Sequence, residues 1–160
     1  MPTSWEPELA RLLGDLSRVQ DELLKMLARK RELLVAADTA GLAALGPQEE
    51  QLAAALQDCL RRREQLLTQA AGEGRPSGSL QALAATLSQA DRKGVEDDLR
   101  AARAQARLLR HHSLTNWVLI QRTLIHLSQV LEIIATGGRL QPTYGGGTPA
   151  PAGALVDRAA

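Results

Sequence analysis

The stretch "WEPELARLLGDLSRVQDELLKMLARKRELLVAADT", residues 5–39, decides the fold class. Its apolar residues recur at alternating steps of three and four, which is the heptad spacing of a helix that packs along one side. Only Lys30 breaks this spacing. The apolar positions are Leu9, Leu12, Leu16, Val19, Leu23, Met26, Leu33 and Ala37. We therefore expect a long amphipathic helix that opens with a capping box, in which Thr3 or Ser4 is the cap and Glu6 its partner.

A second amphipathic helix is expected after the interruption "DTAGLAALGPQEE", residues 38–50. Gly46 and Pro47 are the expected break, because proline suits the first turn of a new helix. The apolar residues of this second helix are Leu52, Leu56, Cys59, Leu60, Leu66 and Leu67. A short connection between two amphipathic helices favours an antiparallel hairpin over residues 5–71. One long kinked rod is the alternative.

The rest of the chain divides at its glycines and prolines. "GEGRPSG", residues 72–78, predicts a flexible linker, and residues 79–90 predict a short helix capped by Ser79. A long helix is expected over residues 94–136, ended by Gly137 and Gly138. Residues 1–138 would form a single helical domain, and the Pro-, Gly- and Ala-rich residues 139–160 a disordered tail. The predicted fold is an all-α hairpin or coiled-coil bundle with a long C-terminal helix.

Composition supports this fold and narrows the function. The chain has no Phe, one Tyr and two Trp, whereas Leu and Ala, both strong helix formers, abound. A formal net charge of +1 offers no electrostatic footprint for nucleic acid. The single cysteine, Cys59, excludes an internal disulfide and fits a small core residue in a reducing compartment. No signal peptide or transmembrane segment is predicted, so we expect a cytosolic protein without membrane insertion.

The residue types that carry catalysis or bind metals do not converge in this sequence. His111 and His112 point about 100° apart on a helix, so they cannot share a metal ion, and His126 lies four turns away. The glycines at 145–147 follow no strand and open no helix, so they predict no phosphate loop. We therefore predict a protein that is not an enzyme and that holds no cofactor or metal.

A second stretch, "LTNWVLIQRTLIHLSQVLEII" at residues 114–134, holds more apolar residues than one packed side needs. On a helical wheel one seam continues the apolar line of the preceding residues, and Leu114, Val118 and Ile125 stand on a separate ridge. The seam contains Trp117, Ile120, Leu124, Leu127, Leu131 and Ile134. The seam is expected to pack on the hairpin. The ridge is either further core or a docking groove for a helix of another protein.

Two blocks of the sequence resemble the FlgN-type flagellar export chaperones. The first is "KRELLVAADTAGLAALGPQEEQLAAALQDCLRRREQLL", residues 30–67. Its matching positions are Lys30, Arg31, Leu34, Val35, Asp38, Leu42, Leu45, Glu49, Glu50, Leu52, Arg63, Leu66 and Leu67. The second is "SLTNWVLIQRTLIHLSQVLEII", where Asn116, Leu119, Ile120 and Leu124 match, while Ser113 departs from a family Asn. The resemblance covers residues 5 to about 145.

The resemblance implies a partner and a site. Such chaperones bind the hook-filament junction proteins FlgK and FlgL in the cytoplasm, hold a helix-forming C-terminal segment, and deliver it to the flagellar export gate. The family's client site maps onto residues 114–134, so the implied partner-binding residues are Leu114, Asn116, Trp117, Val118 and Ile125, with Tyr144 as a candidate contact to the gate. A structural coiled-coil protein that self-associates, for example as a homodimer, is the alternative.

Overall fold

The structure of the protein is a computed structural model, and it describes residues 4–138. Four α-helices make up its regular structure: α1 (Trp5–Val35), α2 (Thr39–Gly72), α3 (Leu80–Ala84) and α4 (Gln89–Thr136). The predicted all-α fold class is therefore confirmed. The contacts divide the chain into two units, residues 1–121 and residues 122–160, and α4 contributes to both. The extent of a single domain over residues 1–138 stays a prediction.

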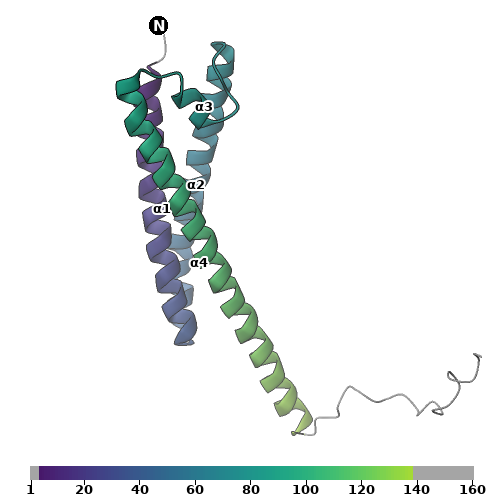
Figure 1. Cartoon of the computed structure of the whole chain (residues 1–160). Helices are drawn as coiled ribbons and strands as arrows, with labels where there is room; N and C mark the ends of the chain where they lie inside the picture. Colours follow the sequence, from purple (N-terminus) through teal and green to yellow (C-terminus); the bar gives the residue numbers. More distant parts are fainter. Residues whose placement is uncertain (1–3, 139–160) are drawn as a thin grey trace, which may run out of the picture. The chain divides into compact units, whose positions relative to one another are not determined.

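Helices α1 and α2 form an antiparallel hairpin (Figure 1). Three side-chain pairs join them along their length. Trp5 Nε1 donates to Glu73 Oε2 at 3.1 Å, Arg62 pairs with Asp15 at 2.5 Å, and Lys30 pairs with Glu49 at 2.8 Å. The residue numbers rise in one helix as they fall in the other, which only an antiparallel pair allows. Of the two arrangements left open by the sequence, the hairpin is correct and the kinked rod is wrong.

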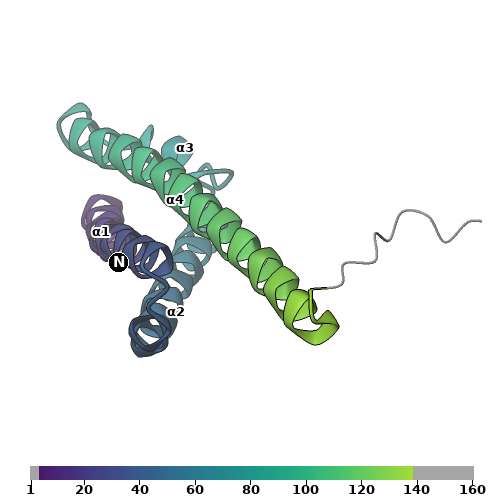
Figure 2. The same ribbon diagram turned by 90° about the horizontal axis from the view of Figure 1, so that it is seen from below.

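The buried core lies in the first unit, at the end of the hairpin where α1 begins and α2 ends. Figure 2 shows α1, α2 and the first half of α4 as three rods that do not lie in one plane. The core residues are Trp5, Leu9, Leu12, Leu13, Val19, Cys59, Leu66, Ala70, Leu80, Leu83, Ala84, Val95, Leu99 and Ala102. Cys59 is buried in this core, which confirms the prediction of a core cysteine. This burial raises the pKa of its thiol.

The turn between α1 and α2 lies earlier than predicted. Helix α2 begins at Thr39 and continues through Pro47, so Gly46 and Pro47 do not break it. Asp38 starts the helix instead, because its side chain accepts a hydrogen bond from the Gly41 backbone N–H at 2.8 Å. Proline removes only one helical hydrogen bond. On its N-terminal side Gly41 lies close to Leu33 of α1, and on its C-terminal side Glu49 pairs with Lys30 of α1. Ser4 makes no side-chain cap bond at the start of α1, so the capping box predicted with Ser4 as the cap is wrong; the alternative cap, Thr3, lies outside the described residues.

The segment between the hairpin and the long helix also differs from its prediction. Helix α3 ends at Ala84, so the helix expected over residues 79–90 covers only its first part, and Ser79 caps it through the Ala82 N–H at 3.0 Å. Helix α4 begins at Gln89 and not at residue 94. Ser88 and Asp91 form its start: the Asp91 N–H donates to Ser88 Oγ at 3.3 Å, and Ser88 Oγ donates to Asp91 Oδ2 at 2.6 Å.

A substitution in the turn checks its geometry. Ala37 has φ of 53°, in the left-handed region that disfavours residues with a Cβ. We expect Ala37→Gly to stabilise the protein by about 0.5–1 kcal/mol, which would raise the melting temperature by roughly 1–4 °C. Its neighbour Ala36 has φ of −78°, so Ala36→Gly should have the opposite sign. Thermal unfolding followed by circular dichroism compares the two, and equal shifts would contradict the turn described here.

Candidate partner-binding face

In the first unit, α4 packs on the hairpin through its core residues Val95, Leu99 and Ala102, and two buried side chains add polar contacts with α1. Gln20 Nε2 donates to the Ala102 carbonyl at 3.1 Å, and Asn116 Nδ2 donates to the Leu27 carbonyl at 2.9 Å. Both Gln20 and Asn116 are buried. Asn116 is the last fully buried residue of α4.

Apolar side chains become exposed at the same point of α4. Within the first unit, Leu114 is 58% exposed, Trp117 57% and Val118 38%. Leu119 and Ile120 are half-buried. A soluble monomer exposes single apolar side chains routinely, but neighbouring large ones on one helix mark an interaction surface.

Exposed apolar side chains also occur along the part of α4 that belongs to the second unit. All described residues from 122 to 138 are exposed. The large apolar ones are Leu124, Ile125, Leu127, Val130, Leu131, Ile133 and Ile134. The prediction that Leu124, Leu127, Leu131 and Ile134 belong to a covered seam is therefore wrong, as it is for Trp117. Full burial in α4 ends at Asn116 and partial burial at Ile120, so the ridge and every seam residue except Ile120 are exposed.

The exposed end of α4 has a second physical interpretation. Among the described residues, α4 alone contains an 18-residue window that is long and apolar enough to cross a membrane by length and composition. None of that window is buried. Gln121, Arg122, His126 and Gln129 lie among these apolar residues, and each would have to leave water to enter a bilayer. The absence of membrane insertion stays a prediction.

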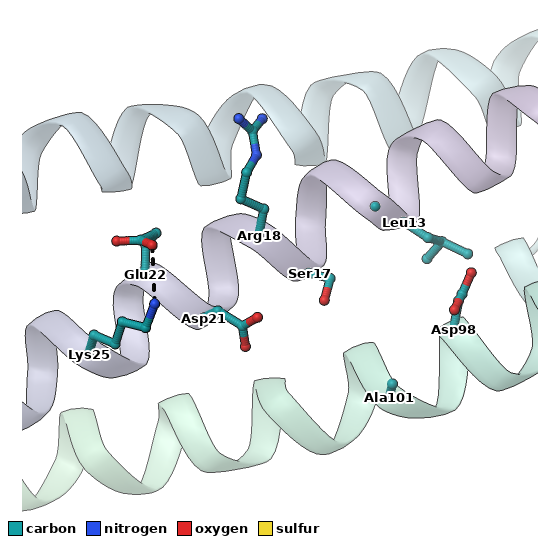
Figure 3. A pocket seen from close by; sticks show the side chains of 9 residues that line it. Leu13, Ser17, Arg18, Asp21, Glu22, Lys25, Asp98 and Ala101 are labelled. Carbon is teal, nitrogen blue, oxygen red and sulfur yellow. Dashed lines mark hydrogen bonds and ion pairs between the residues drawn. The ribbon is translucent and has the colours of Figure 1, made fainter.

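The polar side of the contact between α1 and α4 offers no reaction chemistry. A cleft of about 430 Å³ is lined by Ser17, Arg18, Asp21, Glu22 and Lys25 of α1 with Asp98 of α4 (Figure 3). Its two basic residues pair within α1, Arg18 with Asp15 at 3.2 Å and Lys25 with Glu22 at 3.4 Å. Within residues 4–138, no group of three or more His, Cys, Asp or Glu could hold a metal ion.

The structure distributes the predicted partner-binding residues over different environments. Leu114, Trp117, Val118 and Ile125 are exposed. Asn116 is buried against α1 of its own chain and is not on the open face. Tyr144 lies outside the described residues. The predicted set omitted the exposed residues Leu127, Leu131, Ile133 and Ile134, although the dense apolar content of residues 114–134 was the signal that could have included them.

An all-α fold with an exposed apolar helix face is typical of small helical proteins that bind another protein through that face. The chain belongs to the FlgN family, because the family model described as FlgN protein matches residues 1–148. The predicted resemblance is thereby confirmed. No curated protein and no solved structure matches the chain. By family membership it is a non-enzymatic, cytoplasmic flagellar export chaperone for hook-associated proteins, the group that includes FlgK and FlgL.

Proposed function

We propose that the exposed apolar side chains of α4 between residues 114 and 134 bind the helix-forming C-terminal segment of FlgK and FlgL, and that the chain delivers this segment to the flagellar export gate. One observation carries the proposal: Leu114, Val118 and Ile125, the ridge singled out in the sequence, are all exposed. Family membership supports the choice of partner.

The exposed area supports a reversible complex. Burying one such side chain fully contributes about 1.5–3 kcal/mol, and these side chains are about half exposed, so each gains roughly half of that. Several of them together could supply the roughly 8 kcal/mol of a micromolar complex after ordering costs. A chaperone that must release its client at the gate needs an affinity of this order.

Asn116 contributes to this function by position. Its amide is engaged with the Leu27 carbonyl, so it is not available to a client in this arrangement. A buried polar contact between helices fixes their register, because any other register would leave the amide without a partner. Asn116 therefore sets where along α1 the exposed part of α4 begins. Contact with the client stays a prediction for this residue.

Co-purification tests the proposal. The full chain is mixed with FlgK or FlgL, each as full-length protein and each lacking its C-terminal segment. We expect binding that depends on that segment. Light scattering on the chain alone tests the alternative of a self-associating coiled-coil protein. A stable oligomer that binds neither junction protein would show that the exposed face of α4 pairs with copies of itself.

Delivery is tested by truncating the chain after Gly138, which removes Tyr144. We expect the truncated chain to bind FlgK and FlgL as the full chain does, because residues 114–134 are retained. Secretion of both junction proteins should fall in cells that carry the truncation. Unchanged secretion would remove Tyr144 and its segment from the delivery step.

A further inference from the structure

A second apolar surface lies in the first unit, away from residues 114–134. It is a groove of about 440 Å³ to which all four helices contribute. Its lining consists of Leu13, Leu16 and Gln20 of α1, Leu56, Leu60 and Arg63 of α2, Ser79, Leu80 and Gln81 around the start of α3, and Leu99, Ala102, Arg103, Ala106 and Leu109 of α4. The groove is open to solvent along α2 and α4, where Leu60 is 50% exposed and Ala106 is also exposed.

The groove has the position of a missing helix. Helix bundles enclose their apolar sides with four helices, and here α1, α2 and the first half of α4 supply three. The five-residue α3 closes one end of the remaining side through its buried Leu80 and Leu83. Beyond α3, Leu56, Leu60, Ala106 and Leu109 have no covering helix among the described residues. An apolar space of this shape fits the side-chain stripe of one amphipathic helix.

The charges on the groove select the partner. Arg63 and Arg103 are its only charged lining residues, and both are cations. Arg103 donates to the neutral Gln81 Oε1 at 2.8 Å, and neither arginine pairs with a carboxylate of the described chain. Arg62, one residue away on another side of α2, does pair, with Asp15 at 2.5 Å. The groove therefore presents two guanidinium groups that can pair with carboxylates of an acidic partner.

The floor of the groove also holds an unused acceptor. Gln20 is 4% exposed, and its Nε2 donates to the Ala102 carbonyl. Its Oε1 is buried and has no hydrogen-bond partner in the described part of the chain. A buried amide oxygen without a protein partner is uncommon, and this one belongs to a side chain that lines the groove.

From these contacts we infer a second binding surface. The groove binds an amphipathic α-helix of a partner protein, whose apolar stripe is flanked by carboxylates, in the place of a fourth bundle helix. The carboxylates pair with Arg63 and Arg103 while the stripe covers Leu56, Leu60 and Leu109. A second copy of this chain fits less well, because its apolar segment, residues 114–134, carries only Glu132 as an acidic residue. The inference does not depend on the proposed function, since the two surfaces share no residue.

Two synthetic helical peptides test the inference against the full chain. Both carry the same leucine stripe; one has glutamates beside the stripe, and the other has lysines at those positions. Fluorescence anisotropy of the labelled peptides measures their dissociation constants. We expect the glutamate peptide to bind about tenfold more tightly at low salt, and this preference to shrink as salt is added.

Variants place the binding in the groove. Arg63→Glu with Arg103→Glu should reverse the preference, so that the lysine peptide binds about tenfold more tightly. Arg31→Glu with Arg122→Glu is the matched control: it changes the net charge equally at exposed arginines outside the groove and should leave the preference as it was. Ala106→Trp fills the groove from an exposed helix position and should abolish binding of the glutamate peptide with the helical content retained.

Three results would overturn the inference. The first is equal binding of the glutamate peptide by the native chain and by the double charge reversal at Arg63 and Arg103. The second is loss of peptide binding in Val118→Ser with Ile125→Ser and not in Ala106→Trp, which would place the peptide on the far end of α4. The third is a native dimer in light scattering that Ala106→Trp dissociates, which would make a second copy the occupant. Failure of FlgK and FlgL to bind would leave the peptide results unaffected.

Discussion

Replacing Val118 and Ile125 together with serine is expected to weaken binding of the FlgK and FlgL C-terminal segments by about 10- to 100-fold. The two side chains are 38% and 57% exposed, so a client that covers them gains roughly half of the 1.5–3 kcal/mol that full burial of each would contribute. Helicity and melting temperature should hardly change, because serine, valine and isoleucine have similar helix propensities. Isothermal titration calorimetry with the purified segments measures the loss.

The matched control replaces two exposed polar residues of the same helix. Arg122→Ser with Gln129→Ser removes long side chains from the side of α4 that the helical wheel assigns to solvent. Arginine and glutamine are better helix formers than serine, so this variant should lose slightly more helix stability than the first. Its client affinity should nevertheless stay at the native value. Cooperative unfolding of the valine and isoleucine variant near room temperature would show that these residues belong to a core.

The hairpin could be predicted from sequence because its pattern is local and repeated. Heptad spacing fixes which side of α1 is buried, and Leu9, Leu12 and Val19 from that pattern are indeed core residues. The all-α fold class follows from composition, since few strand-forming residues are present. The buried side of α1 and the fold class each depend on many residues that favour the same structure, so no single residue decides the prediction.

Helix boundaries were predicted less well because single residues and tertiary contacts decide them. Pro47 was expected to start a helix, yet α2 passes through it, and contacts with α1 lie on both sides of it at Gly41 and Glu49. The start of α4 had a readable signal that was overlooked: Ser88 and Asp91 have the spacing of a capping box. The helix was instead expected to begin at Gly94, although nothing near that residue requires a glycine.

The candidate face was predicted in part. The surplus of apolar residues at 114–134 is visible in the sequence, and Leu114, Val118 and Ile125 are exposed in the structure. The exposure of Trp117 could not be predicted from the sequence, because it depends on the point along the hairpin at which the packing of α4 ends. The groove with Arg63 and Arg103 was also not visible, because its lining residues come from four helices that are far apart in the sequence.

Replacing Leu83 with alanine is expected to destabilise the native protein by about 2–5 kcal/mol, the largest effect of any single change considered. Leu83 has no exposed surface and lies in the core beside Leu80 and Ala84. A five-residue helix is far too short to form by itself, so α3 exists only through the side chains that it buries. For a chain of this size the melting temperature should fall by roughly 5–15 °C.

Leu108→Ala is the control, because it removes the same atoms from a leucine that is 50% exposed on α4. Its cost should stay below about 1 kcal/mol, since little apolar area and no cavity are involved. The two variants also separate the two surfaces. Replacing Leu83 should loosen α3, which closes one end of the groove, and should therefore weaken binding of the glutamate peptide. Residues of α4 beyond Asn116 are not part of the core that holds α3, so client affinity should be retained at temperatures below unfolding. Equal destabilisation by the two substitutions would mean that α3 is not fixed in the core, and the groove would then lack its closed end.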